Sequence, residues 1–253
     1  MFLAIDIGNT TSSFGLFNDR QYLNGFKLET SKTIHEGELG KLIHSHLKLK
    51  IPYQEVIKRI GISSVVPEIT QRYIEISQKY LKVIPEQLSP DIDYGFKIGY
   101  EEPNQLGSDR LANVIAVREL YGYPAMVIDM GTATKIELIN AVGDYIGGMI
   151  SPGMRISADA LFEKTSRLYP VTISKPKSLI GTNTTDCLKA GIYYGFLGQL
   201  TAVIDNIKSQ FGIYDIKVIG TGGLISIFEA EPQLFTKIDP ELTMRGLQVA
   251  LDQ

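Results

Sequence analysis

Residues 2–10, FLAIDIGNT, and residues 125–132, AMVIDMGT, form a near-repeat that decides the fold of this chain. In each copy an apolar run leads to an aspartate, Asp6 or Asp129, and a glycine follows two residues later. Short apolar runs of this kind are typical of buried strands, and the glycine indicates a tight turn into a second strand. The pattern predicts two similar hairpins, nearly half the chain apart.

Strand and helix patterns alternate around both hairpins. Second strands are expected at residues 12–17 and 135–139, and another strand at 216–219. Apolar spacing predicts helices over residues 36–49, 67–81, 106–121, 184–211 and 240–251. This alternation predicts an α/β fold of two similar halves, residues 1–115 and 116–253, with the ligand in the cleft between them.

The composition excludes several classes of function. The 253 residues include 25 Lys and Arg against 28 Asp and Glu, and a net charge of −3 does not suit a nucleic-acid or anionic-membrane binder. The single cysteine, Cys187, cannot form an intrachain disulfide or a cysteine-rich zinc site. No stretch reads as a signal peptide or a membrane helix, so we expect a cytoplasmic protein.

The two glycine turns have the composition of phosphate-binding loops. Glycine lets the main chain approach a phosphate closely, so that successive N–H groups point at one anion, and Thr10 and Thr132 add hydroxyl donors. Asp6 and Asp129 would repel a phosphate, so we expect them to hold cations that neutralise it. One Asp-x-Gly turn is more often a plain hairpin, but two copies at strand ends favour nucleotide binding.

A third motif, GSDR at residues 107–110, lies near the start of an expected helix. Asp109 is either a helix-capping residue or a general base that accepts a proton from a hydroxyl attacking the γ-phosphate. Arg110 can steady phosphate or substrate charge. With the two phosphate turns, this motif predicts an ATP-dependent kinase acting on a small metabolite.

Other glycines gather in three places. Residues 147–153 and 220–223 are glycine-dense and are expected to be loops, the second one placed to lie against an adenine ring. Gly191, Gly195 and Gly198 would weaken the expected long helix unless another helix packs closely there. Such packing, across a dimer, is one interpretation, and a local helical bend is the other.

Taken in order, these motifs resemble those of the type III pantothenate kinases, a family with the actin-like ATPase fold. The resemblance covers nearly the whole chain. It is carried by residues 6–10, 63–67 (SSVVP), 107–113 (GSDRLAN) and 129–134 (DMGTAT), and by glycine and threonine segments at 147–153, 181–184 and 221–223.

The resemblance implies a homodimer with two ribonuclease-H-like halves in each chain. The implied reaction is ATP-dependent phosphorylation of pantothenate to 4′-phosphopantothenate, the first step of coenzyme A biosynthesis. ATP would act with Mg²⁺ and with a monovalent cation, K⁺ or NH₄⁺. No nucleic acid or membrane partner is implied.

The resemblance also implies roles for individual residues. Asp109 would be the catalytic base, Asp129 would hold the monovalent cation, and Asp6 would hold Mg²⁺ indirectly. Pantothenate would contact Tyr100, Gly107, Ser108, Asp109, Arg110 and Thr184. The nucleotide phosphates would contact Asp6, Ile7, Gly8, Asn9, Thr10, Thr11, Ser12, Ser13 and Thr132.

Two residues depart from the family pattern: Lys135 and Glu137 stand where the family has Thr and Asp. Lys135 adds a positive charge beside the second turn, unless strand alternation points it away. The dependence of this chain on a monovalent cation therefore stays open. Two other functions remain as alternatives, a kinase for another small metabolite and a non-catalytic regulatory protein. The three aspartates Asp6, Asp109 and Asp129 favour catalysis.

Overall fold

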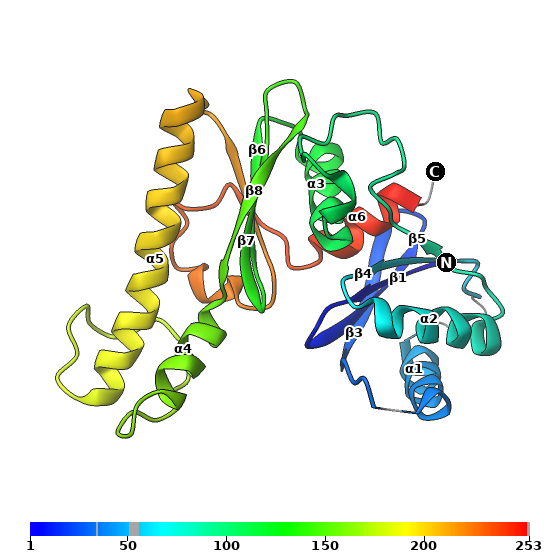
Figure 1. The fold of residues 1–253 in the computed structure, drawn as a ribbon, viewed down its shortest axis with the longest axis horizontal. Helices are drawn as coiled ribbons and strands as arrows, with labels where there is room; N and C mark the ends of the chain where they lie inside the picture. Colours follow the sequence, from blue (N-terminus) through cyan, green and yellow to red (C-terminus); the bar gives the residue numbers. More distant parts are fainter. Residues whose placement is uncertain (34, 51–55, 252–253) are drawn as a thin grey trace. The chain divides into compact units, whose positions relative to one another are not determined.

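A computed structural model describes residues 1–33, 35–50 and 56–251 of the chain (Figure 1). The chain divides into two compact units. The first contains residues 1–120 together with the C-terminal helix α6 (Leu242–Leu251), and the second contains residues 121–240. Each unit has its own five-stranded sheet.

The sheet of the first unit has the strand order β3-β2-β1-β4-β5. Strands β1 (Phe2–Ile7), β2 (Thr11–Asn18) and β3 (Gln21–Glu29) form an antiparallel meander. Strands β4 (Arg59–Ser64) and β5 (Glu86–Gln87) continue the sheet in parallel with β1. The central strand β1 is almost completely buried, as its apolar sequence requires.

The second sheet repeats the first, with the order β8-β7-β6-β9-β10. Strands β6 (Ala125–Met130), β7 (Ala133–Ile139) and β8 (Tyr145–Pro152) are antiparallel, and β9 (Lys217–Thr221) and β10 (Lys237–Ile238) run parallel to β6. Since the two sheets match in strand order and direction, the predicted α/β fold of two similar halves is confirmed.

Helices cover both faces of the first sheet. Helix α1 (Glu36–Lys50) and helix α2 (Pro67–Ile76), which runs into a π-helical turn (Ser77–Leu81), pack on the face that carries Leu3, Ile5 and Ile7. Helix α3 (Ser108–Leu120) packs on α6, and α6 lies on the sheet itself. The helix predicted over residues 67–81 therefore continues to its expected end but changes its hydrogen-bond pattern after Ile76.

The second unit is built around helix α5 (Thr184–Phe211), whose bounds match the predicted ones. Tyr193 and Leu200 pack against alternate residues of β6, Met126 and Ile128, in the core of the unit. Asp129 therefore projects to the other face of the sheet. Helix α4 (Met154–Glu163) precedes α5, and a short 3₁₀ helix (Ile225–Phe228) follows β9.

Three sequence-based expectations about elements differ from the structure. Residues 220–223 were expected to be a loop, but β9 extends through Thr221. Residues 147–153 were expected to be a loop, but β8 extends through Pro152, with Gly147 at a φ of +136° that suits glycine. The division expected after residue 115 lies after residue 120, and helix α6 belongs to the first unit instead of the second. Helix α6 packs there because its apolar side, including Leu242 and Leu247, is buried against α3 and the first sheet.

Helix α5 is long and apolar enough to cross a membrane by length and composition alone. This helix did not stand out by those criteria in the sequence, and a core helix can also meet them. Tyr193, Leu200 and Ile204 lie in the core of the second unit, whereas Gly191 and Gly195 are not covered by neighbouring side chains. The helix thus has the pattern of a core helix with one uncovered side.

Candidate active site

The first Asp-x-Gly turn, which is predicted to bind phosphate, joins β1 to β2. The Gly8 amide donates a hydrogen bond to the Thr11 carbonyl oxygen at 3.1 Å, which closes the turn. Asn9, Thr10 and Thr11 are exposed on it. Asp6, near the end of β1, accepts a hydrogen bond from the Ser63 hydroxyl at 2.8 Å. The turn therefore presents main-chain and hydroxyl donors to solvent beside a carboxylate held in one orientation.

Two of the residues predicted to bind ATP turn their side chains inward. The Ile7 side chain lies in the core of the first unit. The Ser12 hydroxyl is fully buried and is hydrogen-bonded by the Tyr73 hydroxyl and the Thr30 hydroxyl, both at 2.8 Å. Ile7 and Ser12 therefore have only main-chain groups to offer to a nucleotide.

The start of α3 is tied to the end of β4. The Ser108 hydroxyl accepts a hydrogen bond from the Ser64 amide at 2.8 Å and lies 3.1 Å from both the Ser64 carbonyl oxygen and the Ser63 hydroxyl. Because Ser63 also contacts Asp6, one chain of hydrogen bonds links the phosphate turn to this helix. These bonds occupy the Ser108 hydroxyl, so a substrate contact at Ser108 would use its main chain.

Asp109 lies in the first turn of α3, where the helix dipole stabilises a negative charge. Its carboxylate accepts a hydrogen bond from the Arg110 amide at 2.9 Å, and the residue remains partly exposed. A methyl group at Gly107 would lie 2.7 Å from the Asp109 carboxylate. Because position 107 is glycine, there is room for the Asp109 carboxylate. This carboxylate stabilises the start of the helix and remains accessible.

Two predicted substrate residues, Tyr100 and Arg110, lie together in the first unit. The Arg110 guanidinium donates a hydrogen bond to the Tyr100 hydroxyl at 2.7 Å, and its central carbon is 5.4 Å from the centroid of the tyrosine ring. Arg110 is only 5% exposed, so its positive charge is held in place by its surroundings. Thr184, the remaining predicted substrate residue, belongs to the second unit.

The second phosphate turn joins β6 to β7. The Gly131 amide donates to the Ala133 carbonyl oxygen at 3.0 Å, and Thr132 is exposed. The Gly153 amide, just before α4, donates to the Thr132 carbonyl oxygen at 3.2 Å. Gly153 packs so closely on Thr132 that a side chain there would collide with its carbonyl oxygen. The second turn is therefore braced by the chain that leaves β8.

Asp129 in the second unit contacts Lys135. The two residues are directly opposite each other on β6 and β7, and the Lys135 Nζ lies 2.7 Å from the Asp129 Oδ2. Of the two orientations left open by the sequence, the one in which strand alternation points Lys135 away is excluded, because directly opposed residues in an antiparallel pair project to the same face. On the same strand, Glu137 is fully buried and accepts a hydrogen bond from the Tyr145 hydroxyl at 2.6 Å.

One of the two glycines after β9 packs on the same aspartate. Gly222 has a φ of +95°, and a methyl group there would lie 2.5 Å from the Asp129 Oδ1. At Gly223 a methyl group would meet no atom within 4 Å. One glycine is therefore required by close packing and the next lies in open space. The contact of this segment with adenine stays a prediction.

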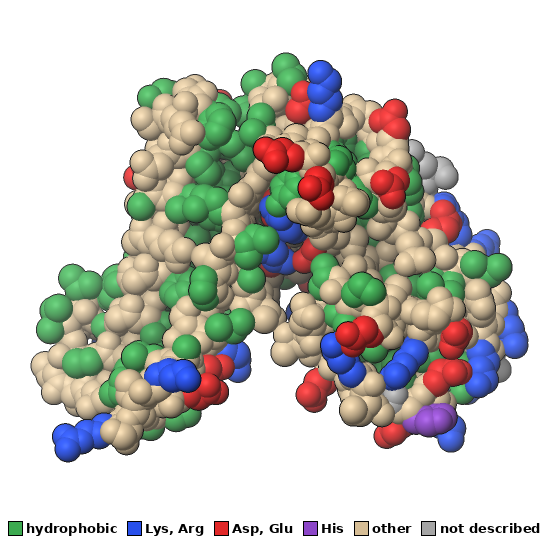
Figure 2. Space-filling model, in the orientation of Figure 1, with side chains coloured by type: hydrophobic (Ala, Val, Ile, Leu, Met, Phe, Trp, Pro, Cys, Tyr) green, Lys and Arg blue, Asp and Glu red, His purple; other side chains and the backbone are tan. Residues whose placement is uncertain are grey.

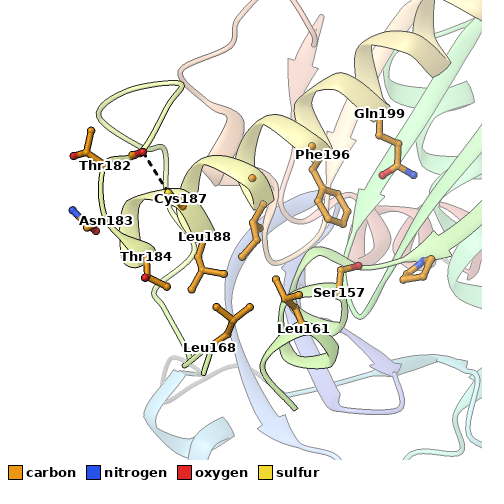
Figure 3. Close-up of a pocket in the computed structure, with 15 residues that line it drawn as sticks. Ser157, Leu161, Leu168, Thr182, Asn183, Thr184, Cys187, Leu188, Phe196 and Gln199 are labelled. Carbon is orange, nitrogen blue, oxygen red and sulfur yellow. Dashed lines mark hydrogen bonds between the residues drawn. The ribbon is translucent and has the colours of Figure 1, made fainter. Parts of the chain in front are cut away.

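The structure contains one further feature that the sequence did not predict as a whole, a groove between α4 and α5. It has a volume of about 820 Å³ and contains Thr184 at the start of α5 (Figure 3). Apolar side chains from both helices and the segment between them line it, including Leu161, Leu168, Leu188 and Phe196. The segments 147–153 and 181–184 and the glycines of α5 stood out in the sequence, but scattered apolar residues do not reveal which surface they line.

The fold and these turns define a class of protein. Two copies of one sheet topology, each with an Asp-x-Gly turn after its central strand, are typical of kinases with the actin-like ATPase fold. A Sinorhizobium meliloti protein assigned as a 2-dehydro-3-deoxygalactonokinase has the same fold, with a TM-score of 0.63 and 12% identity over 99% of this chain and 95% of its own. So does a Campylobacter jejuni protein assigned to the Baf family of transcriptional activators, with a TM-score of 0.60 and 21% identity over 99% and 97%.

Sequence comparison identifies the family within this class. The sequence model of the type III pantothenate kinase family matches residues 2–206. A type III pantothenate kinase from Halalkalibacterium halodurans is 40% identical over 252 residues, which cover 98% of each chain. This chain belongs to the type III pantothenate kinase family.

Proposed function

We propose that this chain transfers the γ-phosphoryl group of ATP to pantothenate, which yields 4′-phosphopantothenate in the first step of coenzyme A biosynthesis. Membership of the family supports the reaction. The observation that carries the mechanism is the hydrogen-bond chain from Asp6 through Ser63 to Ser108, because it couples the phosphate turn to the helix that presents Asp109. The reaction takes place in the cytoplasm, where ATP is supplied.

Asp109 accepts the proton of the pantothenate hydroxyl that attacks the γ-phosphorus. A carboxylate is a sufficient base, because the proton leaves late in a loose transition state and catalysis depends mainly on positioning. Arg110, held by Tyr100, supplies fixed positive charge for the anionic substrate. Gly107 and the Ser108 main chain contact the same substrate, and Thr184 contributes from the second unit.

The exposed donors of both turns bind the phosphates of ATP. Gly8, Asn9, Thr10, Thr11 and Ser13 serve on the first turn, with Asp6 and the main chains of Ile7 and Ser12. Thr132 serves on the second turn. Successive main-chain amides in such glycine turns form a concave site for anions.

Mg²⁺ fits the first turn through water. Among the residues that the structure describes, no three His, Cys, Asp or Glu side chains gather into a metal site. Mg²⁺ commonly keeps several waters and takes its other ligands from substrate phosphates and one or two carboxylates. Asp6 is such a carboxylate, and the ion it holds through water would neutralise phosphate charge. For the monovalent cation, the resemblance and the structure disagree, because Asp129 already contacts an ammonium group.

A homodimer forms through the uncovered side of α5. Methyl groups at Gly191, Gly195 and Gly198 would meet no atom within 4 Å, so a second helix can approach closely there. Figure 2 shows hydrophobic side chains gathered around the end of the unit that carries α4 and α5, where Leu161 and Ile180 are exposed. Covering such side chains would stabilise a dimer.

An ADP-release assay with a panel of small hydroxyl compounds tests the reaction. Release that depends on pantothenate supports the proposal. Release with another compound alone would indicate a different small-metabolite kinase. If no compound stimulates ADP release, a non-catalytic regulatory role, the alternative kept from the sequence, becomes the better account.

A further inference from the structure

The cation position beside Asp129 is filled by a side chain of the protein itself. We propose that the Lys135 ammonium group takes the place of the monovalent cation that the family resemblance implies. Phosphoryl transfer by this chain then needs neither K⁺ nor NH₄⁺. The activity test of this inference rests on the proposed reaction. The stability test does not depend on that reaction.

The contact is imposed by the β6–β7 hairpin. Asp129 and Lys135 are directly opposed in the strand register, and their charged atoms are 2.7 Å apart. Their side chains are only 11% and 17% exposed, respectively. A surface ion pair between two long, mobile side chains contributes little, but this pair is largely buried and is positioned by the ladder of main-chain hydrogen bonds.

The groups around Asp129 are poorly suited to binding a separate ion. The Oδ2 atom contacts Lys135, and the main chain at Gly222 packs against the Oδ1 atom. A K⁺ ion about 4 Å from the ammonium nitrogen would be repelled. At an effective dielectric constant of about 20, this repulsion lowers affinity on the order of a thousandfold. Asp129 therefore does not fit a K⁺ site while Lys135 is present.

The Lys135 ammonium group can supply the positive charge that a bound cation would supply. It carries the same single positive charge as K⁺ or NH₄⁺ and offers three N–H donors. It therefore neutralises the Asp129 carboxylate beside the second phosphate turn without an ion from solution. A threonine at this position, as in the family pattern, carries no charge and would leave that task to a bound cation.

The cation dependence of activity gives the first test. The full-length protein is desalted into choline chloride and assayed for ADP release with pantothenate, Mg²⁺ and the Tris salt of ATP. Choline, Li⁺, Na⁺, K⁺ and NH₄⁺ are compared at one ionic strength. We expect wild-type turnover to vary by less than about twofold. Lys135→Thr should lose roughly tenfold or more in choline and recover with K⁺ or NH₄⁺, because the cation then supplies the missing charge.

Thermal melting in the same salts gives a second measurement that needs no turnover. Lys135→Thr should melt at a higher temperature in KCl than in choline chloride, whereas the wild-type protein should show no such K⁺-specific difference. Lys237→Thr removes an exposed charge from β10 of the same unit and should behave as the wild type does.

Wild-type activation by K⁺ of about tenfold or more, or a wild-type melting shift specific to K⁺, would overturn the inference. If Lys135→Thr does not fold, the wild-type salt profiles still test whether Lys135 replaces the cation. Lys135→Met then provides a second neutral variant. If pantothenate elicits no ADP in any salt, the proposed reaction fails, whereas the melting comparison still decides the role of Lys135.

Discussion

At the scale of single residues, the two repeated aspartates have different partners although their motifs look alike. Asp6 accepts a hydrogen bond from a neutral hydroxyl, that of Ser63, whereas Asp129 contacts the ammonium group of Lys135. A carboxylate that accepts a hydrogen bond from a neutral hydroxyl can still attract a hydrated Mg²⁺. The charge of a carboxylate paired with an ammonium group is already balanced within the pair. The same motif therefore serves two electrostatic roles.

Asp109→Asn tests the catalytic base. An amide cannot accept the hydroxyl proton, so turnover with pantothenate should fall by roughly 10²–10⁴-fold. The melting temperature should change little, because an asparagine also suits a helix start. Glu119→Gln, which removes an exposed carboxylate from the same helix, is the matched control. Near-normal turnover of Asp109→Asn would remove Asp109 from this role.

Glu231 gives a prediction about pH. Its carboxylate contacts Lys175 at 2.7 Å and accepts a hydrogen bond from the Tyr193 hydroxyl at 2.7 Å. Lys175 is the main cause that lowers the pKa of Glu231 from 4.5 to about 2, and Tyr193 adds to it. A carboxyl group with a lowered pKa stabilises the fold fully above its unfolded value. Its contribution is lost as the pH falls from 4.5 towards 2.

Glu231→Gln should therefore lower the denaturation midpoint at pH 7, and the gap from the wild type should narrow below pH 4.5. Urea unfolding across this range measures the gap. Glu229→Gln, at a nearby exposed carboxylate, should show no such trend. A gap that stays constant down to the lowest accessible pH would contradict the assigned pairing.

At the scale of elements, the packing of α6 on α3 holds the end of the chain in the first unit. The Thr243 hydroxyl donates to the Asn113 side chain at 2.8 Å, and Gly246 lies directly against the Ala112 main chain. Helices approach this closely only where one of them lacks a side chain. The glycine in the middle of α6, which weakens an isolated helix, is required by this contact.

Gly246→Ala should destabilise the protein, because a methyl group at that position would collide with the Ala112 carbonyl group. Overpacking of this kind costs about 1–3 kcal/mol, more than the gain of about 1 kcal/mol in helix propensity. Gly37→Ala in α1, where a methyl group would meet only ordinary contacts, should be neutral or slightly stabilising. Chemical denaturation of both variants measures the difference, and equal stabilities would argue against a close contact.

At the scale of the whole molecule, each unit repeats one topology, but the two carry different additions. The first sheet has α1 and α2 on one face, whereas the second has the 28-residue helix α5. Among the helices that the structure describes, only α5 has glycines at which an added methyl group would meet no atom within 4 Å. We therefore expect the second unit to carry the contact between two copies of the chain.

Gel filtration with light scattering should give the mass of a dimer for the wild type. Gly195→Phe should yield a monomer, because a large side chain would prevent close approach of a second helix. Ser209→Phe, at an exposed position about four turns further along α5, should remain dimeric. An active wild-type monomer would contradict the proposed assembly.

The sequence by itself determined the two hairpins, the bounds of α5 and the residues of both Asp-x-Gly turns. These features follow from local patterns, since apolar runs and glycines constrain the chain within a few residues. Only the tertiary structure decided that Lys135 faces Asp129, because a slip of one residue in strand register turns every side chain to the opposite face. It also decided where α6 packs, since an apolar stripe requires a partner but does not specify which surface supplies it.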